Sequence, residues 1–363
     1  MFYSSSYLKQ FTKKIFLKMG SGEIQAQTAA NVLSAADLRG VDSHGVARLE
    51  GYVRLWENKR LNATPVARII HETPSTAVMD GDKGAGLMIA PEAMKVAIEK
   101  AKNVGTGWVA VRNSNHYGIA GYHAMMALDQ DMIGISMTNA SPLVSPTFSK
   151  SRLLGTNPIA VAIPTLKQPP LIIDMATTSV ANGKLEVLQR KGDNIPEGWA
   201  QDKDGETSID AAILKKGGAM LPLGSDRIHG SHKGYCLGGL VDILSAVLSG
   251  ANYGPWVPPF VAFLDPPANP VGEGIGHFIG AMRIDAFRPA GEFKAHMDNW
   301  IETMRKAKPI NAEQNVLIPG DPERETEEKR LIKGIPLQPQ VVKNLIDLGE
   351  QMGVNFLIDE AKI

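Results

Sequence analysis

The chain contains little cysteine: Cys236 is the only one among 363 residues. A single thiol excludes an internal disulfide and any paired-cysteine metal or redox site, and it fits a reducing compartment. No uncharged apolar run reaches the roughly 18 residues that a membrane-spanning helix needs, so no membrane span is predicted. Lys+Arg and Asp+Glu both number 38. This balance argues against a broad surface for nucleic acid or membranes.

The remaining composition is typical of a globular protein with a real core, because 44% of the residues are hydrophobic and 21% are charged. The chain length favours two structural units. Residues 1–22 contain four lysines and no acid, a weak likeness to a transit peptide, but they also contain no arginine. Tyr7, Phe11 and Ile15 recur there at helical spacing. We therefore interpret this segment as a first folded helix and expect a cytoplasmic protein.

Hydrophobic periodicity predicts an α/β mixture without a regular βαβ rhythm. Helices are predicted within residues 1–22 and over about 29–39, 43–58, 91–103, 121–129, 179–190, 234–248, 288–308 and 339–352. Strands are predicted over 67–70, 76–80, 108–111, 133–139, 159–164, 171–174 and 276–287. Residues 191–221 and 254–270 read as irregular, and 319–328 as a highly charged surface tail. Domain boundaries are expected near residues 75 and 288, with helices from both chain ends packing around a central mixed sheet.

The segment 42–48 (DSHGVAR) is the most informative stretch for chemistry. If a helix begins here, His44 and Arg48 share a face, and Tyr52 lies one turn further along. An arginine can grip a carboxylate with two parallel hydrogen bonds, and a histidine can move a proton near neutral pH. The pattern therefore favours an organic acid as substrate. The alternative is an ordinary amphipathic helix capped by Ser43.

His116 is the second candidate, because it follows a predicted buried strand within Asn-Ser-Asn-His-Tyr-Gly, residues 113–118. Polar residues at the end of a strand are held on a rigid scaffold, which suits catalysis. A neutral imidazole there could accept the proton of a substrate hydroxyl. The alternative is a loop histidine that hydrogen-bonds its own turn. His123, in the apolar helix that follows, is interpreted as structural.

Two glycine-rich stretches, residues 81–86 and 272–276, invite a nucleotide-binding interpretation. Neither has the G-x-G-x-x-G spacing or opens a long helix after a buried strand, so a Rossmann domain is not expected. Residues 171–178 suit a ribose or a pyrophosphate better, because a buried strand ends there in an acid and small polar residues. Residues 230–235 offer a cation and free amides at the start of a helix. An ordinary capped loop remains the alternative for each.

The sequence lacks the motifs of two other reaction types, metal-dependent catalysis and serine hydrolysis. The eight histidines form no H-E-x-x-H or other short ligand pair, so no metal site is predicted. His229 and His232 are three residues apart, but no third ligand is implied. A serine-hydrolase mechanism is also not supported, because no G-x-S-x-G elbow is present.

Taken together and in this order, six segments resemble the malate/L-lactate dehydrogenase family, which lacks a Rossmann fold and also contains ureidoglycolate, sulfolactate and diketogulonate dehydrogenases and cyclic-imine reductases. The segments are residues 36–45 (ADLRGVDSHG), 115–118 (NHYG), 154–160 (LGTNPIA), 174–178 (DMATT), 232–235 (HKGY) and 318–324 (IPGDPER). The last segment is similar to members labelled malate dehydrogenase. Cys236 departs from the pattern by standing where glycine is common, and a small side chain there should be tolerated.

This resemblance implies a non-Rossmann, mixed-sheet dinucleotide-binding core over residues 76–288, with a helical substrate and dimer domain formed by 1–75 plus 289–363. It implies an NAD- or NADP-dependent 2-hydroxy acid dehydrogenase that forms a homodimer. Ser43, His44 and Arg48 would surround the substrate. His116 would be the proton acceptor, a role that His44 has in some interpretations of the family. The implied dinucleotide contacts are Asp174, Met175, Ala176, His232, Lys233, Pro319 and Gly320.

Malate and oxaloacetate are the expected substrate pair, and Arg152 is a candidate partner for the second carboxylate of malate. Lactate, sulfolactate, ureidoglycolate, a sugar acid or a cyclic imino acid remain alternatives, and the choice between NAD and NADP is open. A binding protein that keeps the fold without the chemistry is a different class of function. The intact set of Ser43, His44, Arg48 and His116 argues against it, since a binder needs no proton acceptor. A metal-dependent lyase is the other alternative.

Overall fold

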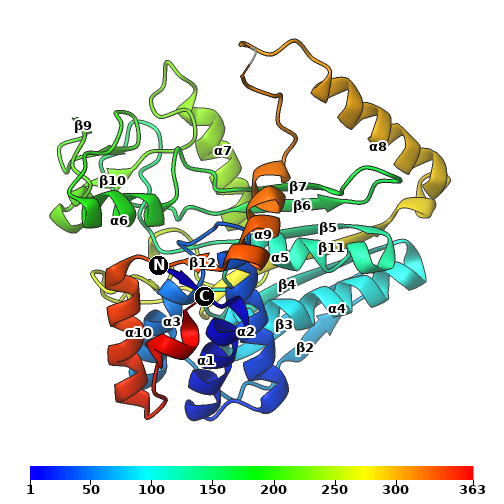
Figure 1. The fold of residues 1–363 in the computed structure, drawn as a ribbon. Helices are drawn as coiled ribbons and strands as arrows, with labels where there is room; N and C mark the ends of the chain where they lie inside the picture. The colour runs from blue at the N-terminus through cyan, green and yellow to red at the C-terminus, as the bar shows by residue number, and fades with distance from the viewer. Residues whose placement is uncertain (312, 363) are drawn as a thin grey trace.

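A seven-stranded mixed sheet lies at the centre of the computed structural model, which describes residues 1–311 and 313–362 (Figure 1). The strand order is β2-β3-β4-β11-β5-β6-β7. Strands β3 and β4 run parallel, whereas the other neighbours in this order run antiparallel. The late strand β11 is inserted between β4 and β5, so distant parts of the sequence meet in the middle of the sheet. The predicted mixed α/β sheet is therefore confirmed.

The elements have the following bounds. The strands are β1 Phe2–Tyr3, β2 Arg68–Glu72, β3 Thr76–Gly84, β4 Thr106–Ser114, β5 Met132–Thr138, β6 Ile159–Ile163, β7 Leu171–Met175, β8 Ala200–Gln201, β9 Thr207–Ser208, β10 Ala219–Met220, β11 Ile275–Arg283 and β12 Ile335–Pro336. The helices are α1 Ser5–Lys18, α2 Glu23–Leu38, α3 Leu49–Glu57, α4 Gly86–Val104, α5 Ala120–Met125, α6 Asn182–Lys191, α7 Ser231–Asp242, α8 Ala290–Arg305, α9 Asp321–Lys333, α10 Pro339–Met352 and α11 Ile358–Ala361.

Helices α4 and α5 cover one face of the sheet with small, fully buried side chains. Ala90, Ala93, Ala97 and Ala101 recur along the buried side of α4. The backbone of α4 comes so near that a Cβ atom on Gly107 of β4 would lie 2.0 Å from the carbonyl oxygen of Ala97. Alanine and glycine at these positions permit this close helix-to-sheet packing, and the contact fixes the amino end of β4 against α4.

A separate apolar cluster collects side chains from both chain ends, and Figure 1 shows the two termini side by side near α1, α3 and α10. Phe356 lies at its centre, with ring centroids 5.0 Å from Phe11, 5.5 Å from Tyr7 and 6.4 Å from Tyr3. Edge-to-face aromatic contacts of this kind add to the free energy gained by burial. Helix α8 packs elsewhere, through Ile301 against the β7 region. The domain boundaries near residues 75 and 288 stay predictions.

Three helices differ from the sequence-based expectation. Helix α4 begins at Gly86, so Pro91 lies inside the helix rather than in its first turn. The charged segment after Pro319 forms helix α9, which is tied to α2 and the turn after it by ion pairs of Arg39 with Glu327 and of Asp42 with Arg330. The helix expected from Ser43 begins six residues later, because the chain first makes a turn around a buried carboxyl group, as described below.

Candidate active site

The loop between α2 and α3 places Ser43, His44 and Arg48. Asp37, at the end of α2, is 1% exposed, and its carboxyl group accepts a hydrogen bond from the Val46 amide at 2.9 Å. The chain wraps so closely around this carboxyl group that a Cβ atom on Gly45 would lie 1.7 Å from Oδ1 of Asp37. This contact bends the segment away from a helix, and a short 3-10 turn over Val46–Arg48 precedes α3. The predicted helical start at Ser43, and its cap, are therefore wrong; Ser43 Oγ instead lies 2.9 Å from Nδ1 of His44.

His116 follows the carboxyl end of β4, as the sequence predicted, and its ring is held on three sides. Nδ1 lies 2.6 Å from the hydroxyl of Tyr52 on α3. The ring stacks on Phe260, with centroids 4.4 Å apart, and on His44, with centroids 5.5 Å apart and an interplanar angle of 18°. Asn115 anchors the loop by donating to the Lys83 carbonyl at 2.8 Å. The fold therefore brings together the two histidines that the sequence singled out.

The surroundings of both imidazoles favour the neutral form. Burial lowers the pKa of His44 to about 3, and the positive charge of Arg48 acts in the same direction. Burial also lowers the pKa of His116 well below its usual value, with smaller contributions from His44 and Arg48. Both rings are thus available as proton acceptors at neutral pH.

The contact with Tyr52 allows His116 to present either tautomer. Burial raises the pKa of Tyr52 well above 10, so its side chain is a neutral phenol that can donate or accept one hydrogen bond. When Nδ1–H donates to the phenol oxygen, Nε2 carries a lone pair and can accept a proton. After Nε2 has taken a proton, the ring is an imidazolium whose Nδ1–H still bonds to the phenol oxygen, and this cation can return the proton from Nε2. The contact with Tyr52 therefore supports proton transfer in both directions through the form with hydrogen on Nδ1.

The guanidinium of Arg48 is fixed by two groups beside these rings. Its Nε donates to the carbonyl oxygen of Ser43 at 2.5 Å. Its two terminal nitrogens face the carboxylate of Glu186 on α6, with NH1–Oε1 at 3.2 Å and NH2–Oε2 at 3.1 Å. Arg48 and Glu186 line a cavity of about 370 Å³ that also borders Phe260, the residue stacked on His116. The arginine is therefore preorganised for a planar acid group next to the histidine pair.

The buried histidines also make stability depend on pH. His123 and His277 are 0% exposed, and burial lowers their pKa values to about 4 and about 3. Below the unfolded pKa of 6.5, the unfolded chain binds a proton at each site and the folded chain does not, so stability falls as the pH decreases. Asp37 acts oppositely, because burial raises its pKa to about 8 and it stays protonated in the folded state. Taken together, these three groups make the unfolded chain bind one more proton than the folded chain. The free energy of unfolding therefore falls by about 1.4 kcal/mol for each unit that the pH decreases between about pH 6 and 4.

Urea unfolding at pH 7 and pH 5 measures this loss, to which the half-buried His44 and His116 add further. Asp174 opposes it below pH 6, because burial raises its pKa to about 6. His277→Gln should remove about 1.4 kcal/mol per pH unit of the dependence, because an amide can still bond to the hydroxyls that contact Nδ1 and Nε2, those of Thr138 at 2.7 Å and Ser114 at 2.8 Å. His71→Gln, on the exposed strand β2, is the matched control and should leave the dependence unchanged. An equal pH dependence in the His277 variant would contradict the assignment.

The expected dinucleotide contacts on β7 lie next to the histidine pair. Asp174 accepts a hydrogen bond from the amide of Gly121 at 2.8 Å. That amide belongs to the start of α5, which follows the turn holding His116. Met175 is 37% exposed and Ala176 is half-buried, so this strand end is accessible from solvent. The segment then leads into α6, where a Cβ atom on Gly183 would lie 2.1 Å from Cβ of Ser43.

The next expected contacts lie on helix α7. His232 and Lys233 lie in the first turn of α7, and Nδ1 of His232 is 2.9 Å from NH1 of Arg227. Helix α7 reaches the β7 segment through Thr177, whose carbonyl accepts the amide of Leu223 at 3.0 Å and whose Oγ1 approaches α7 at Gly238.

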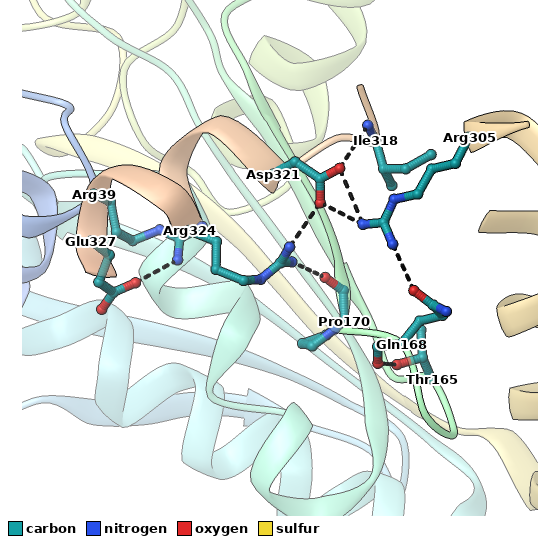
Figure 2. Close-up of polar contacts among 9 residues, drawn as sticks. All are labelled: Arg39, Thr165, Gln168, Pro170, Arg305, Ile318, Asp321, Arg324 and Glu327. Carbon is teal, nitrogen blue, oxygen red and sulfur yellow. Dashed lines mark hydrogen bonds and ion pairs between the residues drawn. The ribbon is translucent and has the colours of Figure 1, made fainter. Parts of the chain in front are cut away.

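Pro319 and Gly320 lie directly on β7, since the Pro319 carbonyl accepts the amide of Ile172 at 3.2 Å. Figure 2 shows how Asp321 fixes this turn. It binds Arg305 of α8, Arg324 of α9 and the Ile318 amide, and Arg324 also donates to the Pro170 carbonyl at 2.9 Å.

These three segments fit a dinucleotide by the chemistry of their donors and acceptors. Asp174 supplies an acceptor for ribose hydroxyls. Lys233 is exposed at the N-terminal end of the twelve-residue helix α7, where cation and free amides favour an anion such as pyrophosphate. The residues come from three parts of the sequence, and the turn at Pro319 and Gly320 bonds directly to β7.

Sequence reasoning missed several neighbours of the site. Phe260 lies in the irregular Pro-rich segment, where no periodicity indicated a role. Glu186 and Arg190 on α6 gave no motif. Arg152 was proposed for a second carboxylate, but its Nε donates to the Gly218 carbonyl at 2.6 Å and NH2 donates to the Leu214 carbonyl. Its guanidinium therefore holds a loop, and the prediction of a substrate role for Arg152 is not supported by these contacts.

Residues 1–311 and 313–362 lack two further features. Within them, no group of three or more His, Cys, Asp or Glu side chains is placed to hold a metal ion. No helix of the described part of the chain combines the length and apolar character that a bilayer crossing requires.

Comparison with known proteins gives consistent results. Residues 3–346 match the family described as malate/L-lactate dehydrogenase. The malate dehydrogenase of Pyrococcus abyssi is 44% identical over 351 residues, covering 96% of this chain and 94% of that protein. The L-sulfolactate dehydrogenase of Methanocaldococcus jannaschii is 37% identical over 349 residues, covering 96% of each. The crystal structure of malate dehydrogenase from Entamoeba histolytica superposes with a TM-score of 0.90 at 35% identity, covering 98% of this chain and 99% of that one.

Proposed function

This chain belongs to the malate/L-lactate dehydrogenase family, and we propose that it interconverts malate and oxaloacetate with NAD or NADP. The observation that carries the proposal is the stacked pair of His44 and His116 beside the preorganised fork of Arg48. A proton acceptor next to a carboxylate receptor is the arrangement that oxidation of a 2-hydroxy acid requires. The name of the Pyrococcus abyssi relative favours malate among such acids.

In the oxidative direction, Arg48 binds the carboxylate of the hydroxy acid and orients its reacting carbon. His116, with Nδ1–H directed to Tyr52, accepts the hydroxyl proton at Nε2. The nicotinamide, when bound, takes the hydride. Asp174, Met175 and Ala176 hold the dinucleotide together with His232, Lys233, Pro319 and Gly320.

In the reductive direction, the same histidine donates from Nε2 to the carbonyl oxygen as negative charge develops there. His44 stacks on this ring and Ser43 bonds to His44, so both set the orientation and polarity around the reacting oxygen.

The surface of α7 and its continuation supports a homodimer. Leu240 is 46% exposed, Ile243 is 56% exposed and Val247 is 52% exposed. These residues are three and four positions apart, so they form one apolar stripe on the helix. A stripe of this kind on a soluble domain favours contact with a second apolar surface. Sedimentation of the purified chain tests this part of the proposal.

The decisive assay follows loss of reduced nicotinamide absorbance with oxaloacetate, pyruvate and sulfopyruvate, each with NADH and with NADPH. We expect the highest kcat/KM with oxaloacetate, and the same plate identifies the nucleotide. Higher kcat/KM with sulfopyruvate would favour sulfolactate instead, as the Methanocaldococcus jannaschii relative suggests. Activity that survives a chelator would exclude the metal lyase. No reaction with any keto acid would contradict the proposal and favour another 2-oxo acid, a cyclic imine or a non-catalytic binder.

A further inference from the structure

The carboxylate of Glu186 occupies the position that the proposed function reserves for a substrate. It faces Arg48 side-on, with the two oxygen atoms opposite the two terminal nitrogens. This is the planar two-bond geometry by which an arginine recognises any carboxylate. The Arg48 side chain is 16% exposed and that of Glu186 is 29% exposed, so the pair lies partly out of solvent at the wall of the cavity.

Two more donors from α6 converge on the same carboxylate. Asn182 donates to Oε1 of Glu186 at 2.9 Å. The guanidinium of Arg190 lies 3.7 Å from Oε2, and its Nε donates to the Glu186 carbonyl at 3.1 Å. Arg48 and Arg190 thus approach one carboxylate from different elements. The two arginines therefore form a binding site for an acid group, and the side chain of Glu186 occupies this site.

Helix α6 is placed to couple this receptor to the active site. Its residue Gly183 packs directly on Ser43, and the helix follows the strand end that carries Asp174. The cavity is also lined by Arg54 and Lys215, but Arg54 donates to the Phe260 carbonyl. Lys215 lies in the 3-10 helix Ile213–Lys216, which also lines the cavity. Among the arginines lining the cavity, Arg190 is the one with its side chain directed to the same acid group as Arg48.

We propose that Glu186 holds the place of the substrate and that a dicarboxylic 2-hydroxy or 2-oxo acid replaces it, with one acid group on Arg48 and the other on Arg190. This rests on the proposed function and specifies its substrate class. The exchange keeps the charge around Arg48 balanced before and after binding. An acid with two anionic groups should displace Glu186 better than an acid with one. The reason is that its two groups replace the contacts that Glu186 makes with both arginines.

The first test compares substrates with one and two acid groups in Arg190→Gln. We expect KM for oxaloacetate to rise by about 10- to 100-fold, the range for one lost charge-assisted contact. The kcat/KM for pyruvate should change by less than about 3-fold, because it has no second acid group. Lys191→Gln removes the same charge from the next position of α6 and is the matched control. A parallel loss with both substrates would overturn the role of Arg190.

The second test removes the internal competitor. Glu186→Gln keeps the shape of the side chain and removes its charge, so KM should fall by about 5- to 10-fold for oxaloacetate and pyruvate alike, with kcat changed little. Glu50→Gln removes a carboxylate that lines the same cavity but bonds to Asn344, and it should have the smaller effect. A higher KM in Glu186→Gln would show that Glu186 orients Arg48 instead of competing for it.

Calorimetry separates this inference from the proposed function. L-malate and L-lactate are titrated into the dinucleotide-loaded wild-type protein, Glu186→Gln and Arg190→Gln, with melting temperatures to confirm folding. Tighter binding of both acids by Glu186→Gln, and selective loss of malate binding by Arg190→Gln, would support the exchange even if no keto acid were reduced. Turnover by the wild type together with unaltered malate binding in both variants would overturn the exchange and leave the proposed function intact.

Discussion

Replacing His116 with alanine is expected to lower kcat by about 100-fold or more, the usual contribution of a positioned acid–base group. The Nδ1 atom of His116 contacts Tyr52 and also accepts the Gly118 amide of its own turn at 3.4 Å, and its ring fills the space between His44 and Phe260. Removing the ring leaves a hydroxyl proton without an acceptor, while Arg48 and its contacts remain. The KM for the hydroxy acid should therefore change much less than kcat.

Steady-state kinetics over a pH series gives the measurement, and Tyr52→Phe provides a second readout. Losing the phenol removes the group that stabilises each tautomer, so Tyr52→Phe should alter the pH profile of kcat with a smaller loss than His116→Ala. His296→Ala, on the exposed face of α8, is the control for a histidine substitution as such. An undiminished rate in His116→Ala together with a large loss in His44→Ala would assign the proton to His44.

The parts of the fold governed by local periodicity were predictable from the sequence. Strand β5 alternates between buried and half-buried residues along its whole length, and its predicted bounds differ from the observed ones by one residue at each end. The start of α3 was not predictable in this way. It depends on the carboxyl group of Asp37, which binds the Val46 amide from the preceding helix. A pattern that considers only spacing within 43–58 cannot include a contact made from outside that range.

The candidate site shows the same limit. His44 and His116 were found because each occurs in a polar segment beside an apolar element. Phe260 and Glu186 were not found, because each reaches the site from a segment whose own sequence is unremarkable for function. Their roles come from contacts across more than a hundred residues of sequence, such as the stacking of Phe260 on His116 and the pairing of Glu186 with Arg48. Local rules identify the chemically active side chains better than the side chains that surround them.

Replacing Arg48 with lysine is expected to raise KM for the hydroxy acid by about 100-fold while kcat falls much less. The positive charge is retained, but an ammonium group cannot form two parallel bonds to a carboxylate and also donate from Nε to the Ser43 carbonyl. The loss corresponds to about 3 kcal/mol of binding free energy, the upper end for a hydrogen bond to a charged group. Initial rates over a wide substrate range give both constants, and normal saturation would contradict the role.

Arg283→Lys is the matched control, because Arg283 also pairs with a carboxylate through two nitrogens, at 2.8 and 2.7 Å from Asp285, but on an exposed part of the chain. The double variant Arg48→Lys with Glu186→Gln adds a further constraint. If Glu186 affects the substrate only by occupying the guanidinium of Arg48, Glu186→Gln should lower KM in the wild type. The same substitution should have little effect in the Arg48→Lys variant, which has no guanidinium at this position. Equal effects in both backgrounds would mean that Glu186 acts through the general charge of the cavity, and that Arg48 binds the substrate independently of it.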